Sequence, residues 1–335
     1  MNSVFNSKYK INFTFQFTKI KLIICYHEVK IKYLVFFFFF LISPISLVFS
    51  SELQSLNTFT KATQIFTFKV LLEENNIRAS QDNVSKNEIN DFHQSYVIGY
   101  GKKLPHNDFV MISLPFIKSE ENGVKYNGDH SLVYHSKGFT EPTIAYFKRY
   151  KTPNKDNEYI KDFSVAFTPS LFEKKSGTIE ANKATGGHIL QLKGSSGALY
   201  KIWEARLISE FHYFFHNKDH NLKTNTTYTK TPFYQALFGI EIQYKYSDHW
   251  YFNTGSGIQI IQDAYTNSSE EEKDTLIQLG TGSVGYFGFT YRLRDDVYKM
   301  KVFRAKNDFF VEGTTSNFRG EYTKFLIAFD YLTEF

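Results

Sequence analysis

Residues 325–335 read FLIAFDYLTEF, and this stretch decides how the rest of the chain is interpreted. One parity of the tail is apolar or aromatic: Phe325, Ile327, Phe329, Tyr331, Thr333 and Phe335. The other parity carries the charges of Lys324, Asp330 and Glu334. Successive side chains of a β-strand point to opposite faces, so this alternation predicts a strand with one apolar and one polar face.

Two stretches further upstream alternate in the same way. Around 203–215 the apolar parity holds Trp203, Ala205, Leu207, Phe211, Tyr213 and Phe215, and the polar parity holds Glu204, Arg206, Glu210 and His212. In 250–263 Trp250, Phe252, Ile258 and Ile260 oppose Asn253, Gln259 and Asp263. Strands that turn an apolar face to lipid must close into a ring, because unpaired backbone groups cost several kcal/mol each in hydrocarbon.

The whole of residues 51–335 divides into alternating stretches and polar connections. Twelve strands are predicted at 59–73, 93–102, 107–117, 141–151, 158–172, 185–192, 199–216, 231–246, 250–264, 275–292, 297–312 and 320–335. Long connections at 74–91, 118–140, 173–184, 217–230, 265–274 and 313–319 alternate with short ones at 103–106, 152–157, 193–198, 247–249 and 293–296. The pattern predicts an all-β fold, an antiparallel up-and-down transmembrane β-barrel of about twelve strands. Ten or fourteen strands remain possible, because the first and sixth are weakly marked.

Residues 1–50 are predicted to be a leader. An apolar run at 33–49 follows Lys30 and Lys32 and precedes small residues, which is the pattern of a secretory signal peptide at 29–50, cut after Ser50. An uncleaved membrane anchor is the alternative. Residues 1–28 fit a signal poorly, and the true start is expected at Val29.

Charge and composition exclude several classes of function. The leader holds six Lys and one acid, which leaves 33 basic and 33 acidic side chains in the other 285 residues. A basic footprint is therefore absent, and no nucleic-acid partner is expected. The sequence shows neither metal-ligand spacing nor a phosphate-cradling glycine loop before a helix, so we predict no metal and no cofactor.

The tail resembles the C-terminal assembly signal of Gram-negative outer-membrane barrels, with Phe335 at the end, Tyr331 four residues earlier and Phe329 before it. This resemblance implies the cell outer membrane as location, with lipid, lipopolysaccharide and the barrel-assembly machinery as partners. Residues 138–150 (GFTEPTIAYFKRY) and 111–116 (MISLPF) more weakly resemble transporter barrels named after the MetA pathway of phenol degradation. Glu141 stands where that family usually has Asp.

Inward charge favours a narrow channel or transporter for a small solute. The candidates for lining the lumen are Glu204, Arg206, Glu210, His212, Glu241, Gln243, Lys245, Asn253 and Gln259. The same charges can instead pair across the interior and plug a small barrel. The eleventh strand fits poorly, because Lys299 and Lys301 share one parity and Arg304 and Lys306 the other, so a bulge or an early exit is expected.

Two other functions remain open. Ser209, His212, His216, Asp219 and His220 cluster in sequence, as an outer-membrane lipase or protease would require, but Ser209 and His212 fall on opposite parities. We therefore predict no catalytic residue. The other alternative is a surface receptor or structural barrel that acts through its external loops.

Overall fold

The structure is a computed structural model that describes residues 63–81, 85–105, 108–122, 133–153, 158–176, 184–222, 225–268, 275–278, 280–312 and 317–334. The predicted leader and the terminal Phe335 lie outside the described residues. In the described part of the chain all regular elements are β-strands, and no helix is long and apolar enough to cross a membrane.

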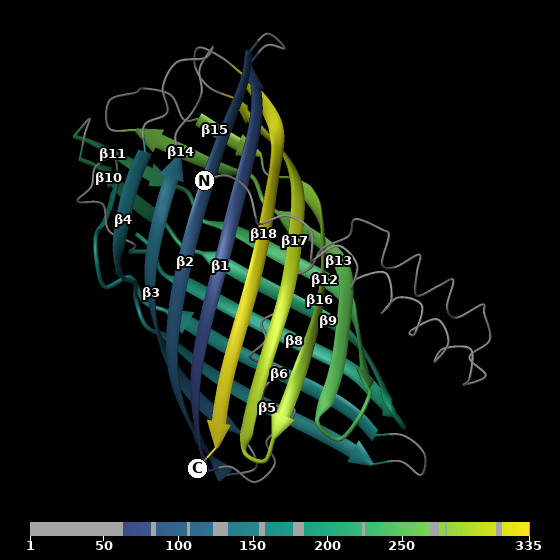
Figure 1. Ribbon diagram of the computed structural model, residues 1–335. Coiled ribbons are helices and arrows are strands. Elements are labelled where there is room, and N and C mark those ends of the chain that lie inside the picture. The colour runs from purple at the N-terminus through teal and green to yellow at the C-terminus, as the bar shows by residue number, and fades with distance from the viewer. Residues whose placement is uncertain are drawn as a thin grey trace, which may run out of the picture. The chain divides into compact units, whose positions relative to one another are not determined.

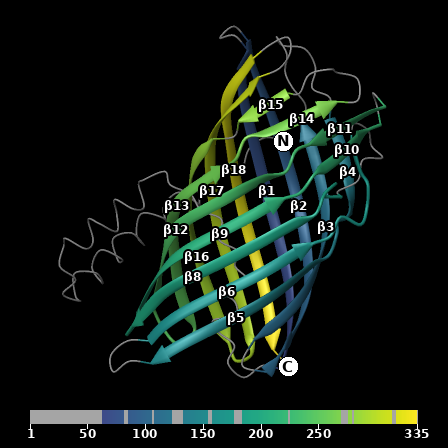
Figure 2. The ribbon, with the colours of Figure 1, turned by 180° about the vertical axis from the view of Figure 1, so that it is seen from behind.

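Twelve long strands close into an antiparallel barrel, which confirms the predicted fold class (Figures 1 and 2). They are β1 (Gln64–Gln81), β2 (Ser85–Lys103), β3 (Phe109–Asn122), β5 (Thr143–Pro153), β6 (Glu158–Thr168), β8 (Ile189–Tyr200), β9 (Trp203–Phe214), β12 (Phe233–Lys245), β13 (Trp250–Ile261), β16 (Thr281–Leu293), β17 (Asp296–Glu312) and β18 (Asn317–Glu334). Each pairs with the next, and β18 pairs back with β1, where Tyr331 lies opposite Phe68. Closure removes the two free edge strands that an open sheet of these twelve strands would have, as a sheet in a bilayer requires.

Shorter strands extend the wall at one end. They are β4 (Val133–Phe139), β7 (Lys174–Ser176), β10 (Asn217–Asn221), β11 (Thr226–Lys230), β14 (Ala264–Ser268) and β15 (Thr275–Gln278). β10 follows β9 and β11 precedes β12, while β14 follows β13 and β15 precedes β16. These four short strands pair with one another in the same order as the long strands that they extend. Figures 1 and 2 show them at the rim opposite the C-terminus, here called the upper end. The short turns lie at the lower end.

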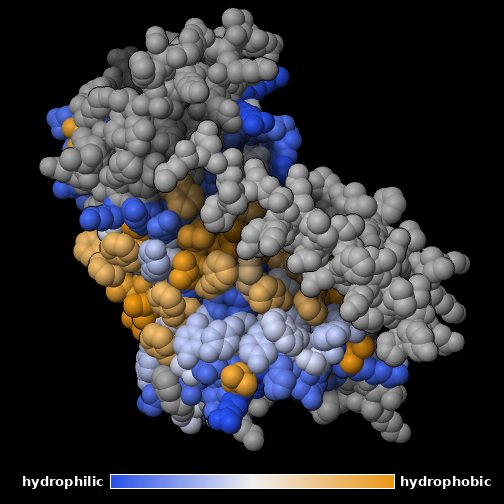
Figure 3. Space-filling model, in the orientation of Figure 1, coloured by the Kyte–Doolittle hydropathy of each residue, from blue (hydrophilic) through white to orange (hydrophobic). Residues whose placement is uncertain are grey.

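The apolar parity faces outward. Leu207 is 65% exposed and Phe238 50%, while Arg206 and Leu237 beside them are buried. Figure 3 shows hydrophobic side chains crossing the middle of the face over β1, β2, β17 and β18, with more hydrophilic ones below. Such a band suits the hydrocarbon core of a bilayer.

Aromatic rings border this band on both sides. At the lower end neighbouring strands bring rings together in the pairs Trp203–Tyr244, Trp250–Tyr291 and Tyr298–Tyr331. Towards the upper end the pairs are Phe116–Phe139, Phe167–His188 and Phe211–Tyr234. From Trp203 to Tyr213 the strand rises by about 33 Å, or about 25 Å across a membrane at a tilt of about 40°. That height matches the apolar band of known outer-membrane barrels.

The predicted turn at 193–198 is wrong. β8 continues through these residues to Tyr200, and the chain turns at Lys201 and Ile202, with Tyr200 opposite Trp203. Lys201 adopts the positive φ of 54° that suits a tight hairpin turn. The glycines and serines that resemble a turn in the sequence therefore lie inside a strand, and Leu199 belongs to β8.

The predicted long connection at 74–91 is also wrong. β1 and β2 remain paired as far as Gln81 opposite Ser85, so most of this polar stretch is a hairpin of two strands. Above the apolar band both faces of a strand meet water. Backbone pairing then continues although the alternation of side chains has ended.

The eleventh predicted strand, β17, has neither a bulge nor an early exit. It pairs with β18 without interruption from Asp296 to Glu312. Lys299 and Lys301 are buried on the inner face, whereas Arg304 is exposed on the outer face. Lys306, also on the outer face, lies 2.7 Å from Glu321 through Nζ and Oε1. A regular strand therefore carries basic residues on both faces.

Candidate channel interior

The inner face of the barrel carries four groups of side chains. They are a lower apolar layer (Ile65, Phe109, Met111, Ala145, Phe147, Ala166, Val297, Leu332), a charge layer (Lys69, Arg149, Asp162, Glu204, Arg206, Glu241, Lys299, Lys301, Asp330), an upper apolar layer (Ile208, Leu237, Val284, Tyr286, Phe303, Ala305, Leu326) and a polar layer (Glu73, Asn75, Lys193, Glu210, His212, Gln259, Asn307, Lys324). On β17 the four groups follow one another from the lower end upward, as Val297, Lys299 and Lys301, Phe303 and Ala305, and finally Asn307. On β5 and β6 the order differs, since Arg149 and Asp162 lie nearer the lower turn than Phe147 and Ala166.

Asp162 is the centre of the charge layer. It accepts two hydrogen bonds from Arg149, at 2.6 Å from Nε and 2.5 Å from Nη2. Arg206 donates a third from Nη1 over 2.7 Å, and its guanidinium also contacts the Glu204 carboxylate. Arg206 is only 4% exposed. The four side chains thus form one buried ionic network that spans β5, β6 and β9.

Glu241 extends this network to the next strand. It lies directly opposite Arg206 on β12 and is 2% exposed. The cations that act on it electrostatically are Lys301, Arg206 and Lys299. A carboxylate this deeply buried requires cationic neighbours to remain charged.

The far side of the charge layer is basic. Lys299 lies opposite Asp330 on β18, and Asp330 also has Lys69 at 3.8 Å from the other side. The ammonium of Lys301 sits 4.0 Å from the ring centre of Tyr286, which is cation–π geometry. The charge layer therefore contains five basic and four acidic side chains, which lie on β1, β5, β6, β9, β12, β17 and β18.

The polar layer holds a second set of pairs. Glu210 accepts from Lys193 at 2.8 Å and contacts His212 Nε2 at 2.7 Å. Lys324 bonds Glu73 at 2.5 Å on the opposite wall. Gln259 and Asn307 are buried in the same layer.

The predicted lumen residues fall at different heights. Glu204, Arg206 and Glu241 meet in the charge layer, while Glu210, His212 and Gln259 lie in the polar layer. Gln243 is half-buried. It lies opposite Glu204 on β9 and opposite the buried Asn253 on β13.

Lys245 is the exception. Its ammonium lies 2.7 Å from Asp248 in the lower turn, away from the network of Arg206. This hydrogen bond from Lys245 holds the pKa of Asp248 below its usual range. Lys245 thus lies near the lower end of β12, apart from the group that Arg206 and Glu241 form.

Sequence reasoning missed the acid at the centre of the network. The prediction places Asp162 in a strand but does not include it among the lumen residues, although Ile160, Asp162, Ser164 and Ala166 occupy alternate positions. All four are buried, and the parity of β6 was the available signal. The sequence predicts an irregular strand at Lys299 and Lys301, whereas both side chains belong to the charged inner face of a regular strand.

Glu141 links the barrel to the loop after β6 at the upper end. Its side chain is fully buried just before β5. Its carboxylate accepts hydrogen bonds from the backbone amides of Thr185, at 2.9 Å, and Phe172, at 3.4 Å. Next to Thr185, Gly186 has a φ of 71°, and an added Cβ there would strike the Lys218 carbonyl. Glu141 therefore fixes this connection against the rim.

The residues of the enzyme alternative do not form a catalytic arrangement. Ser209 is exposed on the outer face, and its hydroxyl contacts the Gly194 carbonyl at 3.5 Å. His212 faces inward to Glu210, Asp219 pairs with Lys174, and His220 contacts Thr227. Ser209 and His212 therefore lie on opposite faces of β9, and the hydroxyl that contacts His220 belongs to Thr227.

Comparison with known proteins connects this geometry to solved barrels. No family model matches the chain, and no curated protein matches it in sequence. The COG4313 outer membrane channel from Pseudomonas putida F1 superposes with a TM-score of 0.56 at 10% identity, over 83% of this chain and 97% of that one. The transport unit of the autotransporter AIDA-I from Escherichia coli gives 0.46 at 8% identity, over 85% and 97%. The P. putida toluene transporter TodX gives 0.39 at 8% identity, over 87% and 95%.

The likeness to the COG4313 channel shows a shared fold, and the other two structures superpose with lower TM-scores. Its coverage extends over nearly the full length of the solved channel. The chain therefore has the fold of the COG4313 outer membrane channel, one antiparallel sheet of long strands closed into a barrel.

Proposed function

We propose that this protein is an outer-membrane channel for a small solute, with a path through the barrel that is narrowest at the charge layer. The observation that carries the proposal is the division of faces on single strands. On β9, Trp203 and Leu207 face outward, while Glu204 and Arg206 face inward. A wall that is apolar outside and charged inside suits a bilayer around it and a polar solute within it.

The proposal includes the route to the membrane. A signal peptide at 29–50 would carry the chain across the inner membrane, and the strand that ends at Phe335 would engage the barrel-assembly machinery. The lower end would then face the periplasm and the upper end the exterior. Lipid would contact the apolar band, and lipopolysaccharide its upper border.

The charge layer supports a selective passage. Charged rings at a constriction sort permeating ions by sign, and paired acids and bases can exchange their hydrogen bonds with a solute that carries similar groups. The side chains of this layer are almost fully buried, so they must move apart for a solute to pass. The same burial favours the second candidate, a barrel whose interior is plugged by ion pairs and acts structurally.

Single-channel recording in planar bilayers separates the two functions. A channel should give discrete openings, whereas a plugged barrel should remain silent. Arg206→Gln removes a positive charge from the constriction and should shift selectivity towards cations, while Glu241→Gln should shift it towards anions. Lys151→Gln is the control, since Lys151 pairs with Glu158 at the lower end, outside the charge layer. Silence of the folded wild-type protein, or equal selectivity in all variants, would contradict the channel.

A further inference from the structure

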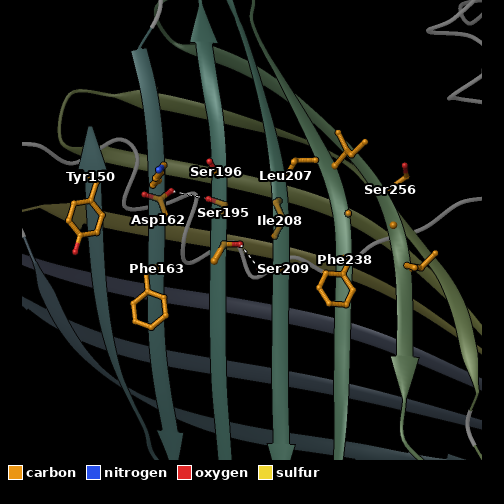
Figure 4. A pocket seen from close by; sticks show the side chains of 16 residues that line it. Tyr150, Asp162, Phe163, Ser195, Ser196, Leu207, Ile208, Ser209, Phe238 and Ser256 are labelled. Atoms are coloured by element: carbon orange, nitrogen blue, oxygen red, sulfur yellow. Dashed lines mark hydrogen bonds between the residues drawn. The ribbon is translucent and has the colours of Figure 1, made fainter. Parts of the chain in front are cut away.

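A groove of about 1010 Å³ lies on the outer wall over β5, β6, β8, β9, β12 and β13. Its volume is at the upper end of the range of about 300–1,000 Å³ that ligand sites occupy. Figure 4 shows Phe163 and Phe238 on either side of Ser209, with Leu207 and Ser196 near the same strands. Phe163, Leu207, Phe238 and Ile258 all line it and are 44–65% exposed. The groove therefore opens to the outer surface of the barrel.

The wall beneath the groove is closed. β6, β8, β9, β12 and β13 are paired residue by residue through this region. The hollow arises because Gly194, Ser196, Ser209 and Ser256 occupy outward positions where neighbouring positions carry large apolar side chains. The groove is thus an apolar site on the surface that faces lipid.

Among the described residues that line the groove, one is a cation. Lys161 is exposed on the outer face of β6, two residues above Tyr159 and near the lower end of the strand. Its register partners, Tyr150 and Ser196, are uncharged. The only acid among the described lining residues is Asp162, which faces inward and is held by Arg149 and Arg206.

A lysine on a lipid-facing surface is best tolerated near the membrane border, where its long side chain reaches the headgroups. Basic pockets on membrane proteins bind phosphate headgroups in this way. Lys161 lies beside an apolar groove large enough for a hydrocarbon chain. An anionic lipid fits both features, because its headgroup is negatively charged and its acyl chains are apolar.

We propose that the groove binds one phospholipid of the lower leaflet, with its phosphate at Lys161 and an acyl chain between Phe163 and Phe238. The site requires the barrel to lie in a membrane but does not require it to conduct.

Native mass spectrometry in detergent with added phosphatidylglycerol tests the site. The wild-type protein should retain one phospholipid. Lys161→Gln should lower the retained fraction about tenfold, the size expected for loss of a hydrogen bond to a charged group. Ser209→Phe should fill the groove and remove the adduct. Glycerophosphate, which has no acyl chain, should give no adduct.

Two matched variants serve as controls. Ala205→Phe enlarges an outward residue of β9 that does not line the groove, and Lys306→Gln removes an outward lysine near the upper end. Both should retain the lipid, and heat-modifiable gel mobility should show that every variant is folded. Equal retention in all four variants would overturn the proposal. If Ser209→Phe instead removed dimers and kept the lipid, the groove would be a contact between two copies of the chain, and the lipid proposal would be overturned.

Discussion

Arg206 and Asp162 are joined by a hydrogen bond of 2.7 Å although they lie on strands that are not neighbours. β8 runs between them, and Gly197 is its residue opposite Arg206. A Cβ at Gly197 would run into the Arg206 side chain and the Ala205 carbonyl oxygen. The missing side chain thus leaves the space through which the guanidinium reaches Asp162.

Arg206→Ala should lower the free energy of unfolding by about 3 kcal/mol. Removal of one partner of a buried ion pair typically costs about 3–5 kcal/mol, and water entering the interior should reduce this loss. Adding Glu241→Ala should recover part of it, since the acid left beside the gap is then gone. Urea unfolding of the barrel in lipid vesicles measures both.

The matched control for Arg206 is Lys151→Ala. Lys151 and Glu158 form an ion pair with side chains 36% and 32% exposed, and exposed pairs contribute about 0–1 kcal/mol. If Arg206→Ala is as stable as Lys151→Ala, the buried network does not stabilise the barrel.

Gly197→Ala should disturb the charge layer from a neighbouring strand. The added methyl group displaces the Arg206 side chain, and overpacking of this kind costs about 1–3 kcal/mol. Combined with Arg206→Ala, the same substitution should cost less, because the clash with that side chain is relieved. Gly138→Ala is the control, as no atom lies within 4 Å of a Cβ built there. Additive effects of Gly197→Ala and Arg206→Ala would argue against the contact.

Glu141→Ala should loosen the connection after β6. It leaves the amides of Thr185 and Phe172 without their acceptor, at a cost of about 1–3 kcal/mol. Glu141→Gln keeps one carbonyl oxygen and should lose less. Hydrogen exchange at the Thr185 amide reads the effect directly. Unchanged protection in Glu141→Ala would mean that other contacts hold the loop.

Trp203 and Trp250 should both be quenched by brominated lipids. They are 44% and 38% exposed on the outer face, and they are the two tryptophans of the chain. The variants Trp203→Phe and Trp250→Phe allow each indole to be measured alone. A tryptophan that is not quenched would place its strand one residue out of register, which turns every side chain to the other face.

Removal of Phe335, or its replacement by lysine, should impair assembly more than the activity of barrels already formed. The motivation is the alternation of β18, in which Phe329 and Tyr331 occupy the outer parity that Phe335 shares. Membrane levels and heat-modifiable mobility provide the measurement, with Thr333→Ser as a mild change on the same face. Wild-type levels of the lysine variant would refute an assembly signal.

Local pattern was sufficient to place the strands within the lipid-facing band. In Trp203–Phe214 and Trp250–Ile261 the two faces meet different surroundings, so the sequence alternates and the register can be read. Where both faces meet water, as in the upper halves of β1 and β2, no alternation survives. The polar sequence there therefore predicts a loop, although the backbone is paired.

The interior contacts could not be read in the same way. Parity shows that Arg206 and Glu241 point inward, but it does not show how far around the ring each side chain reaches. Asp162 became the partner of Arg206 only because β8 alone separates β6 from β9 and Gly197 of β8 left room between them. The sequence alone determined which face of each strand meets lipid, since that depends on alternation within about ten residues. Only the tertiary structure decided which interior charges meet, since that depends on strand stagger and on side-chain volume across the barrel.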